Sequence, residues 1–197
     1  MKITRATRRA NLASRSRAPV GVNVRRHNPR SRTTKGRKVP SLTYPSCIRR
    51  LYESEVNGEA IFLALLKAAK FERDRYHLAT LLQLETETKA WLQPFLFKHG
   101  VEFSRPDIKP IIDQALSLYD ANGWNGLMLG AQQMATSALA DFEAIAAAGP
   151  EEDQSYLRGM VRHERAILNW VTGELRGAGD GSLADIIAQL KFPIPHG

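Results

Sequence analysis

Four long segments with apolar residues at helical spacing are the feature that most constrains the fold of this 197-residue chain. Within each segment the apolar side chains recur every three or four residues, which is the period of one helix face. Glycine or proline follows the last three of these segments, at Gly100, at Gly149 and Pro150, and at Gly177. The expected helices run from about Ser46 to Lys70, Asp74 to Lys98, Trp124 to Ala148 and Glu151 to Arg176. The sequence therefore predicts an all-α fold of four antiparallel helices.

The connection between the second and third helices is long for a helix–helix loop. Residues 104–122 contain Pro106 and Pro110 and only a short apolar pattern, so they predict a connection with a minor helix. A crossover connection at this point is what a bundle of two paired hairpins requires. Residues 182–190 predict one further short helix.

The charge of the chain is divided between its two parts. The whole chain has 28 basic and 20 acidic residues, but 15 of the basic ones and none of the acidic ones lie in residues 1–50. The rest of the chain therefore has a formal net charge of −7. Residues 1–40 show no helical or strand period and bury too little to offset their ordering entropy. We expect a disordered basic arm over residues 1–40 and a helical bundle over residues 41–197.

Three interpretations of the basic arm fit its composition. It can be a solvated tail without a dedicated partner, an arm that neutralises phosphates of nucleic acid or another anionic surface, or an organellar transit peptide, for which an Arg-rich and acid-free composition is typical. The single cysteine, Cys47, cannot form an internal disulfide and suits a reducing compartment. No apolar run approaches the roughly 20 residues of a membrane span. We expect a cytoplasmic protein, or an organellar one if the arm is a transit peptide, and homo-oligomerisation stays open.

The two halves of the bundle resemble each other as an internal repeat. Residues 81–92 align with residues 160–171, so that Glu85 meets Glu164, and residues 58–61 align with residues 142–145, so that Glu59 meets Glu143. Each of these four glutamates interrupts an apolar stripe of its helix. Because an unpaired buried carboxylate costs several kcal/mol, four that converge must be protonated, hydrogen-bonded or bound to metal.

This pattern resembles the ferritin-like di-iron carboxylate family, over about residues 46–176. The resemblance implies a four-helix bundle with two metal ions, Fe or Mn, bound by Glu59, Glu85, Glu143 and Glu164. It departs from the family's Glu-x-x-His motif because Thr88 and Ile167 occupy both histidine positions. An all-carboxylate site favours hard ions such as Mn, Mg or Ca, or holds no metal at all.

Two other residues bear on this site. His163 directly precedes Glu164, and a rotation of the helix by one residue would turn its imidazole inward as a metal ligand. Glu55 is expected to be a surface charge.

Two functions of different classes follow from this pattern. One is a carboxylate-bridged di-metal oxidase or hydroxylase. The alternative is a metal-free bundle that acts as a binding or structural module and contacts an anionic partner through its arm. Motifs of nucleophile elbows, phosphate loops, zinc sites and dinucleotide sites do not occur in the chain, so whether it is an enzyme depends on the carboxylate cluster.

The phosphate-binding interpretation of the arm makes a measurable prediction. If residues 1–40 neutralise phosphates, binding of the full chain to RNA or DNA falls steeply with salt concentration and shows little sequence preference, because counterion release drives it. Fluorescence anisotropy with an unrelated RNA and DNA at several salt concentrations measures this. Deletion of residues 1–40 should abolish the binding, and unchanged binding after the deletion would remove this interpretation.

Overall fold

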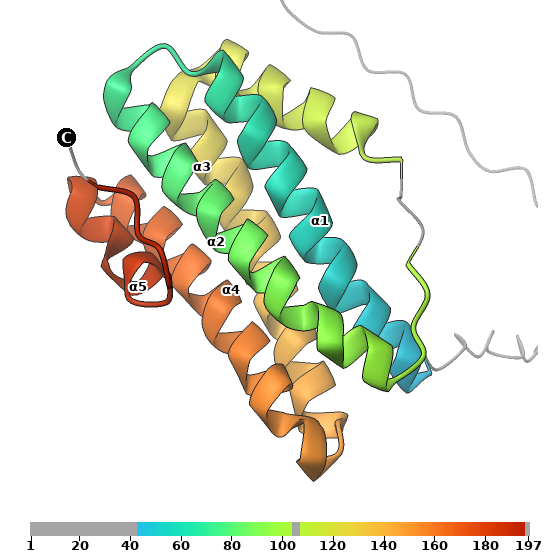
Figure 1. The fold of residues 1–197 in the computed structure, drawn as a ribbon. Coiled ribbons are helices and arrows are strands. Elements are labelled where there is room, and N and C mark those ends of the chain that lie inside the picture. The colour runs from blue at the N-terminus through green and yellow to red at the C-terminus, as the bar shows by residue number, and fades with distance from the viewer. Residues whose placement is uncertain (1–42, 104–106, 196–197) are drawn as a thin grey trace, which may run out of the picture. The chain divides into compact units, whose positions relative to one another are not determined.

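The computed structural model describes residues 43–103 and 107–195, and every regular element in these residues is helical. The long helices are α1 (Tyr44–Ala68), α2 (Glu72–Lys98), α3 (Lys109–Ala148) and α4 (Gln154–Leu175) (Figure 1). Two short 3-10 helices, Glu151–Asp153 and Gly179–Leu183, and the one-turn helix α5 (Ala184–Ile187) complete the list. The predicted all-α class is confirmed, whereas the predicted arm lies outside the described residues.

The long helices pair as two hairpins. Residues 69–71 join α1 to α2, and residues 149–153 join α3 to α4, so the helices of each pair run in opposite directions (Figure 1). In contrast, α2 ends and α3 begins at opposite ends of the helical body. Each hairpin contributes two helices to one common interior, because α1 also packs against α3.

Helix α3 is longer than the sequence predicted because it joins two helical segments, with a break in the backbone between them. At Gly123 the backbone has φ 62° and ψ −160°, a conformation that favours glycine. The first part, residues 109–122, corresponds to the predicted minor helix, and the second part begins at Trp124 as expected. The break therefore lets the first part turn across the end of the body before the second part runs along it (Figure 1).

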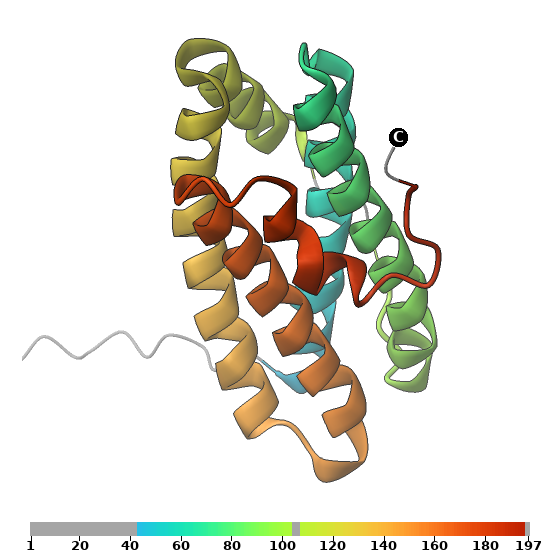
Figure 2. The same ribbon diagram turned by 90° about the vertical axis from the view of Figure 1, so that its left-hand side faces the viewer.

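The C-terminal segment lies across α2 and α4 (Figure 2). The imidazole of His77 in α2 fixes part of it, since Nε2 lies 3.0 Å from Asp180 Oδ1 while Nδ1 accepts a hydrogen bond of 3.0 Å from Trp170 Nε1. Further along, the carboxylate of Glu87 accepts hydrogen bonds from the backbone N–H groups of Lys191 and Phe192. These contacts extend the packed body beyond the four long helices.

The buried apolar side chains form two clusters at different levels of the helices. One cluster includes Leu65, Leu81, Leu84, Met128, Ala166 and Trp170, and the other includes Ile48, Leu51, Leu92, Phe95, Phe142 and Met160. Each of α1, α2 and α4 passes from one cluster to the other, and at that boundary each carries a buried acid: Glu55, Glu85 and Glu164. The two clusters thus enclose a polar layer between them.

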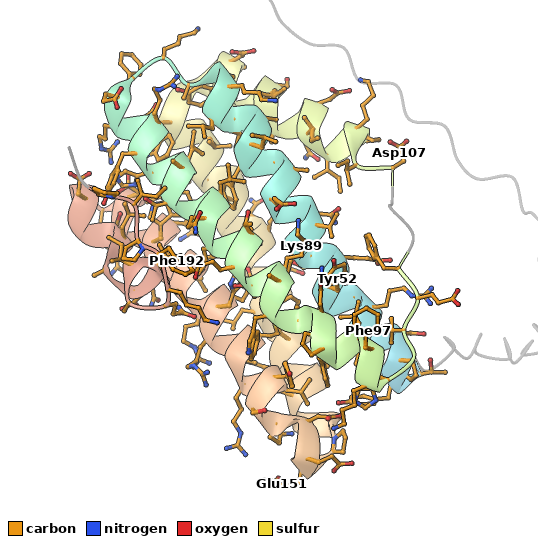
Figure 3. The ribbon with its side chains drawn as sticks, viewed as in Figure 1. Tyr52, Lys89, Phe97, Asp107, Glu151 and Phe192 are labelled. Atoms are coloured by element: carbon orange, nitrogen blue, oxygen red, sulfur yellow. The ribbon has the colours of Figure 1, made fainter. Side chains whose placement is uncertain are left out.

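Some large apolar side chains stay outside these clusters. Phe97, near the end of α2, and Phe192, in the C-terminal segment, are exposed (Figure 3). Among the described helices, none is both long and apolar enough to cross a membrane.

Candidate metal centre

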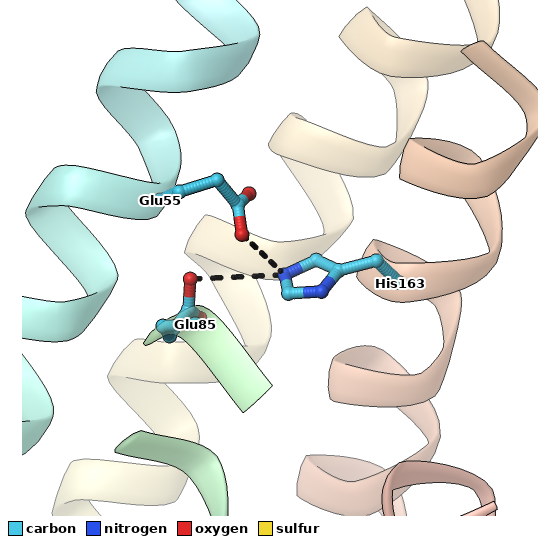
Figure 4. A group of neighbouring side chains, drawn as sticks. All are labelled: Glu55, Glu85 and His163. Atoms are coloured by element: carbon cyan, nitrogen blue, oxygen red, sulfur yellow. Dashed lines mark ion pairs between the residues drawn. The ribbon is translucent and has the colours of Figure 1, made fainter. Parts of the chain in front are cut away.

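His163 lies at the centre of the polar layer. Its imidazole is buried, and Nδ1 lies 3.1 Å from the hydroxyl oxygen of Thr88 in α2. The other ring nitrogen, Nε2, faces two carboxyl groups, at 3.4 Å from Glu55 Oε2 and 3.8 Å from Glu85 Oε2 (Figure 4). When Nδ1–H donates to the Thr88 hydroxyl, Nε2 keeps its lone pair for a ligand between the carboxyl groups. Thr88 therefore orients the imidazole.

Glu55 and Glu85 bring their carboxyl groups to this nitrogen from α1 and α2. Both residues are buried, Glu55 completely. No N–H or hydroxyl group in the described part of the chain donates a hydrogen bond to either carboxyl oxygen of Glu55. Its polar neighbours are the Glu85 carboxyl group and Nε2 of His163, and a hydrogen bond between the two carboxyl groups requires one of them to carry a proton. The pair is therefore short of hydrogen-bond donors.

Gly58 makes room for the Glu85 side chain. A Cβ atom at position 58 would lie 2.5 Å from the carboxyl carbon of Glu85, which is closer than real Cβ contacts come. Any other residue would displace that carboxyl group. The approach of α1 to α2 at this point thus depends on a residue without a side chain.

Glu164 is the third buried carboxyl group of the layer. It follows His163 in α4 and is 5% exposed. Burial raises its pKa from 4.5 to about 7. Its charge in turn raises the pKa values of Glu55 and Glu85. It therefore belongs to the same electrostatic cluster, although the ligand atoms that converge most closely are those of Glu55, Glu85 and His163, which all lie within 4.8 Å of one another.

Burial disfavours charge on every member of this cluster. It raises the pKa of Glu55 and of Glu85 well above 4.5, and for Glu85 the neighbouring carboxyl groups of Glu55 and Glu164 add to the effect. Burial also lowers the pKa of His163 from 6.5 to about 3. Without a cation, the cluster is thus stable as protonated carboxyl groups around a neutral imidazole.

Two of the predicted ligands do not join this cluster. Glu59 forms an ion pair with Lys89 and accepts a hydrogen bond of 3.0 Å from Thr86 Oγ1, at the outer boundary of α1 and α2, where Lys89 is labelled in Figure 3. Glu143 forms an ion pair with Arg165 and its side chain is 49% exposed. The expectation that both glutamates face the interior is therefore wrong, because each lies at a helix boundary where a cation of the neighbouring helix pairs with it.

The structure also corrects the prediction for Glu55, which was expected at the surface. Its position completes a spacing of three and four residues with Ile48, Leu51 and Tyr52, all of which are buried. The same kind of spacing links Met160, His163, Glu164 and Ile167 in α4. This wider stripe brings both His163 and Glu164 inward, so no rotation of the helix is needed. The spacing of apolar residues that places Glu55 and His163 in the interior was therefore present in the sequence.

Two hollows flank the cluster. A cavity of about 220 Å³ lies on the side of α1 and α3, and Glu85 and Glu164 line it among mainly apolar residues. A cleft of about 280 Å³ lies on the other side, between α2, α4 and the C-terminal segment, where Thr88 and His163 line it together with Trp91, Arg162 and Lys191. Small molecules can thus approach the buried groups from two directions.

No protein-family model matches this chain, and neither a curated protein nor a solved structure matches it. The geometry of the cluster is therefore the basis for any assignment of function.

The pKa shifts predict how the stability of the metal-free protein depends on pH. Between about pH 4.5 and 7 the folded protein keeps a proton on Glu164 that the unfolded chain has released, so the free energy of unfolding falls as the pH rises, by up to about 3 kcal/mol for this group. Glu55 and Glu85 act in the same direction. His163 acts in the opposite direction between about pH 3 and 6.5, since only the unfolded chain binds its proton there.

Urea unfolding in the presence of a chelator, at pH 5 and pH 8, measures this dependence. Between pH 5 and pH 8, the free energy of unfolding of the natural protein should fall by about 3 kcal/mol more than that of Glu164→Gln. Glu143→Gln is the matched control, because its carboxylate is exposed and paired with Arg165, and it should follow the natural protein. Equal pH dependence in Glu164→Gln and the natural protein would contradict the assigned burial of this carboxyl group.

Proposed function

We propose that this protein is a ferritin-like helical-bundle metalloprotein in which Glu55, Glu85 and His163 bind one divalent transition-metal ion. The observation that carries the proposal is the convergence of these three buried groups, with ligand atoms within 4.8 Å of one another. Each comes from a different helix, so the bundle interior itself would form the site.

The donor set fits such an ion. Carboxylate oxygen and imidazole nitrogen together suit Mn, Fe and Zn, whereas an all-oxygen set would favour Mg or Ca. The carboxyl oxygens of Glu55, which lack a donor from an N–H or hydroxyl group, would be satisfied by a cation. A bound ion would also offset the cost of burying several carboxylates in an apolar interior.

One ion fits the described residues better than the two that the family resemblance implies. Helix α3 contributes buried apolar residues, Ala135 and Phe142, on its inner face, while its acid Glu143 is engaged with Arg165 outside. Glu164 remains as a third carboxylate beside the ion and supplies negative charge rather than a converging ligand atom. A second ion would therefore lack the carboxylate from the third helix.

Several features support the ferritin-like bundle as the scaffold. The long helices form two hairpins, and the chain passes from one end of the body to the other between α2 and α3 (Figure 1), as a crossover between the hairpins would require. The inward acids of α1, α2 and α4 lie at one level between the two apolar clusters. The imidazole, however, comes from the residue before Glu164, and Thr88, in one of the family's histidine positions, holds it in place.

We infer oxidase or hydroxylase chemistry as the activity of this centre. A redox-active metal bound here would supply the reaction with oxygen. The residues of the chain would bind and orient that metal, since Thr88 fixes the orientation of the His163 ring. The cavity beside Glu85 and Glu164 would admit a small reactant.

A metal-free binding or structural module is the second candidate. The observation in its favour is that neither residue in the family's histidine positions, Thr88 or Ile167, supplies an imidazole, and that Glu59 and Glu143 are engaged in ion pairs. In this case the cluster would stay protonated, and the basic arm would provide the contact with an anionic partner.

Metal content separates the two candidates. Protein purified without chelator should contain about one Mn, Fe or Zn per chain by elemental analysis, and added metal should raise the melting temperature because only the folded state binds it. Glu55→Gln and His163→Gln should each abolish both effects, since each removes a ligand.

Glu59→Gln and Glu143→Gln are the matched controls, because they remove the glutamates that lie outside the cluster. Both should retain the metal. Natural protein that neither contains nor binds metal would favour the metal-free module, and loss of metal in the two controls as large as in Glu55→Gln would contradict the assigned ligand set.

A further inference from the structure

The cleft that Thr88 and His163 line has three walls: α2, α4 and the C-terminal segment, which crosses both helices in Figure 2. The Glu87 carboxylate accepts hydrogen bonds from the backbone N–H groups of Lys191 and Phe192, and these bonds fix the third wall to α2. The volume of the cleft is about 280 Å³, whereas an apolar cavity that holds benzene has roughly 150 Å³. One ring with a polar substituent therefore fits.

Trp91 supplies an apolar surface in this cleft. Its indole ring packs on the ring of Tyr156, with the ring centroids 4.8 Å apart. Its edge lies against Gly159, where a Cβ atom would be 2.3 Å from Cη2 of the indole. Leu84 lines the cleft beside it. An apolar or aromatic group in the cleft would therefore contact a ring whose position is fixed by its neighbours.

Two cations of the cleft have no acidic partner. Of the three arginines of α4, Arg158 and Arg165 each form an ion pair with a glutamate. Arg162 lies between them, exposed and in the lining of the cleft. No acid among residues 43–103 and 107–195 pairs with it or with the ammonium group of Lys191. Both cations are thus available to a ligand.

Glu87 is the one acid among the described residues that line the cleft. Its Oε1 accepts hydrogen bonds from the Gln83 amide and the Phe192 N–H group, and its Oε2 accepts one from the Lys191 N–H group. These bonds occupy its carboxylate in holding the C-terminal segment. Arg162 and Lys191 outnumber it, so the charged side chains of the cleft favour an anion over a neutral or cationic ligand.

We propose that this cleft binds a small organic anion, a carboxylate with an apolar part. The guanidinium group of Arg162 would hold the carboxylate, because its planar fork matches the two carboxylate oxygens. The ammonium group of Lys191 would add a second positive charge, and the apolar part would contact Trp91. This site goes beyond the proposed function, since none of these side chains is a ligand of the metal centre.

Benzoate and benzamide test the proposal because they share a shape and differ in charge. An NMR titration of the full chain follows the indole N–H resonances of its three tryptophans, and the resonance lost in Trp91→Phe identifies Trp91. Benzoate should shift this resonance with an affinity about tenfold higher than that of benzamide. The resonances of Trp124 and Trp170, which do not line the cleft, should stay in place. Equal affinities, or no shift of the Trp91 resonance with benzoate, would overturn the proposal.

Arg162→Gln and a matched control locate the anion. Arg162→Gln should weaken benzoate by about fivefold, the upper range for an exposed charge pair, and leave benzamide unchanged. Arg158→Gln removes the same charge one turn away in α4 and should keep the affinity of the natural protein. Both variants retain the basic residues 1–40, so any attraction of anions to that segment cancels. Unchanged affinity for benzoate in Arg162→Gln, or an equal loss in Arg158→Gln, would overturn the proposal.

A repeat of the titration with a chelator separates this site from the metal centre, because a carboxylate also binds metal ions. The affinity for benzoate should be the same with and without the chelator. Loss of benzoate binding on removal of the metal would assign the anion to the metal ion instead of Arg162 and overturn this proposal. Elemental analysis of the untreated sample tests the metal centre independently.

Discussion

The burial of three carboxyl groups around one imidazole is the constraint on which the rest of this structure depends. Glu55, Glu85 and Glu164 have raised pKa values because the interior around them is apolar. An interior of this kind tolerates such groups only when protons or a cation neutralise them. Protonation neutralises the cluster without metal, and the proposed divalent ion would neutralise it in place of these protons.

The helical part of the fold could be predicted because its signals are local. The apolar spacing and the proline and glycine breaks predicted both ends of α1, α2 and α4, and the end of α3, to within a few residues. The merging of the minor helix with the third helix was not predicted, since the sequence does not reveal that Gly123 interrupts α3 for only one residue. The structure shows one bent helix because the backbone is helical on both sides of Gly123.

The site was predicted less well because facing direction depends on neighbouring helices. Glu85 and Glu164 lie inside as expected, but Glu59 and Glu143 were assigned to the interior from spacing alone, without their partners Lys89 and Arg165 on the adjacent helices. One helical turn separates Glu55 from Glu59, and only the packing of α1 against α2 decides which of them is buried. The internal repeat was a poor guide here, because the position of α3 that corresponds to Glu55 is Leu139.

The chain therefore has one asymmetric centre where a symmetric one was expected. Anomalous diffraction from crystals of metal-supplemented protein, recorded at the absorption edge of the added metal, tests the proposed metal centre most directly. The account predicts one anomalous peak within bonding distance of Glu55, Glu85 and His163 Nε2, with Glu59 and Glu143 remote from it. Crystals grown from metal-supplemented protein that show no peak there, with the Glu55 and Glu85 carboxyl groups sharing a proton instead, would contradict it.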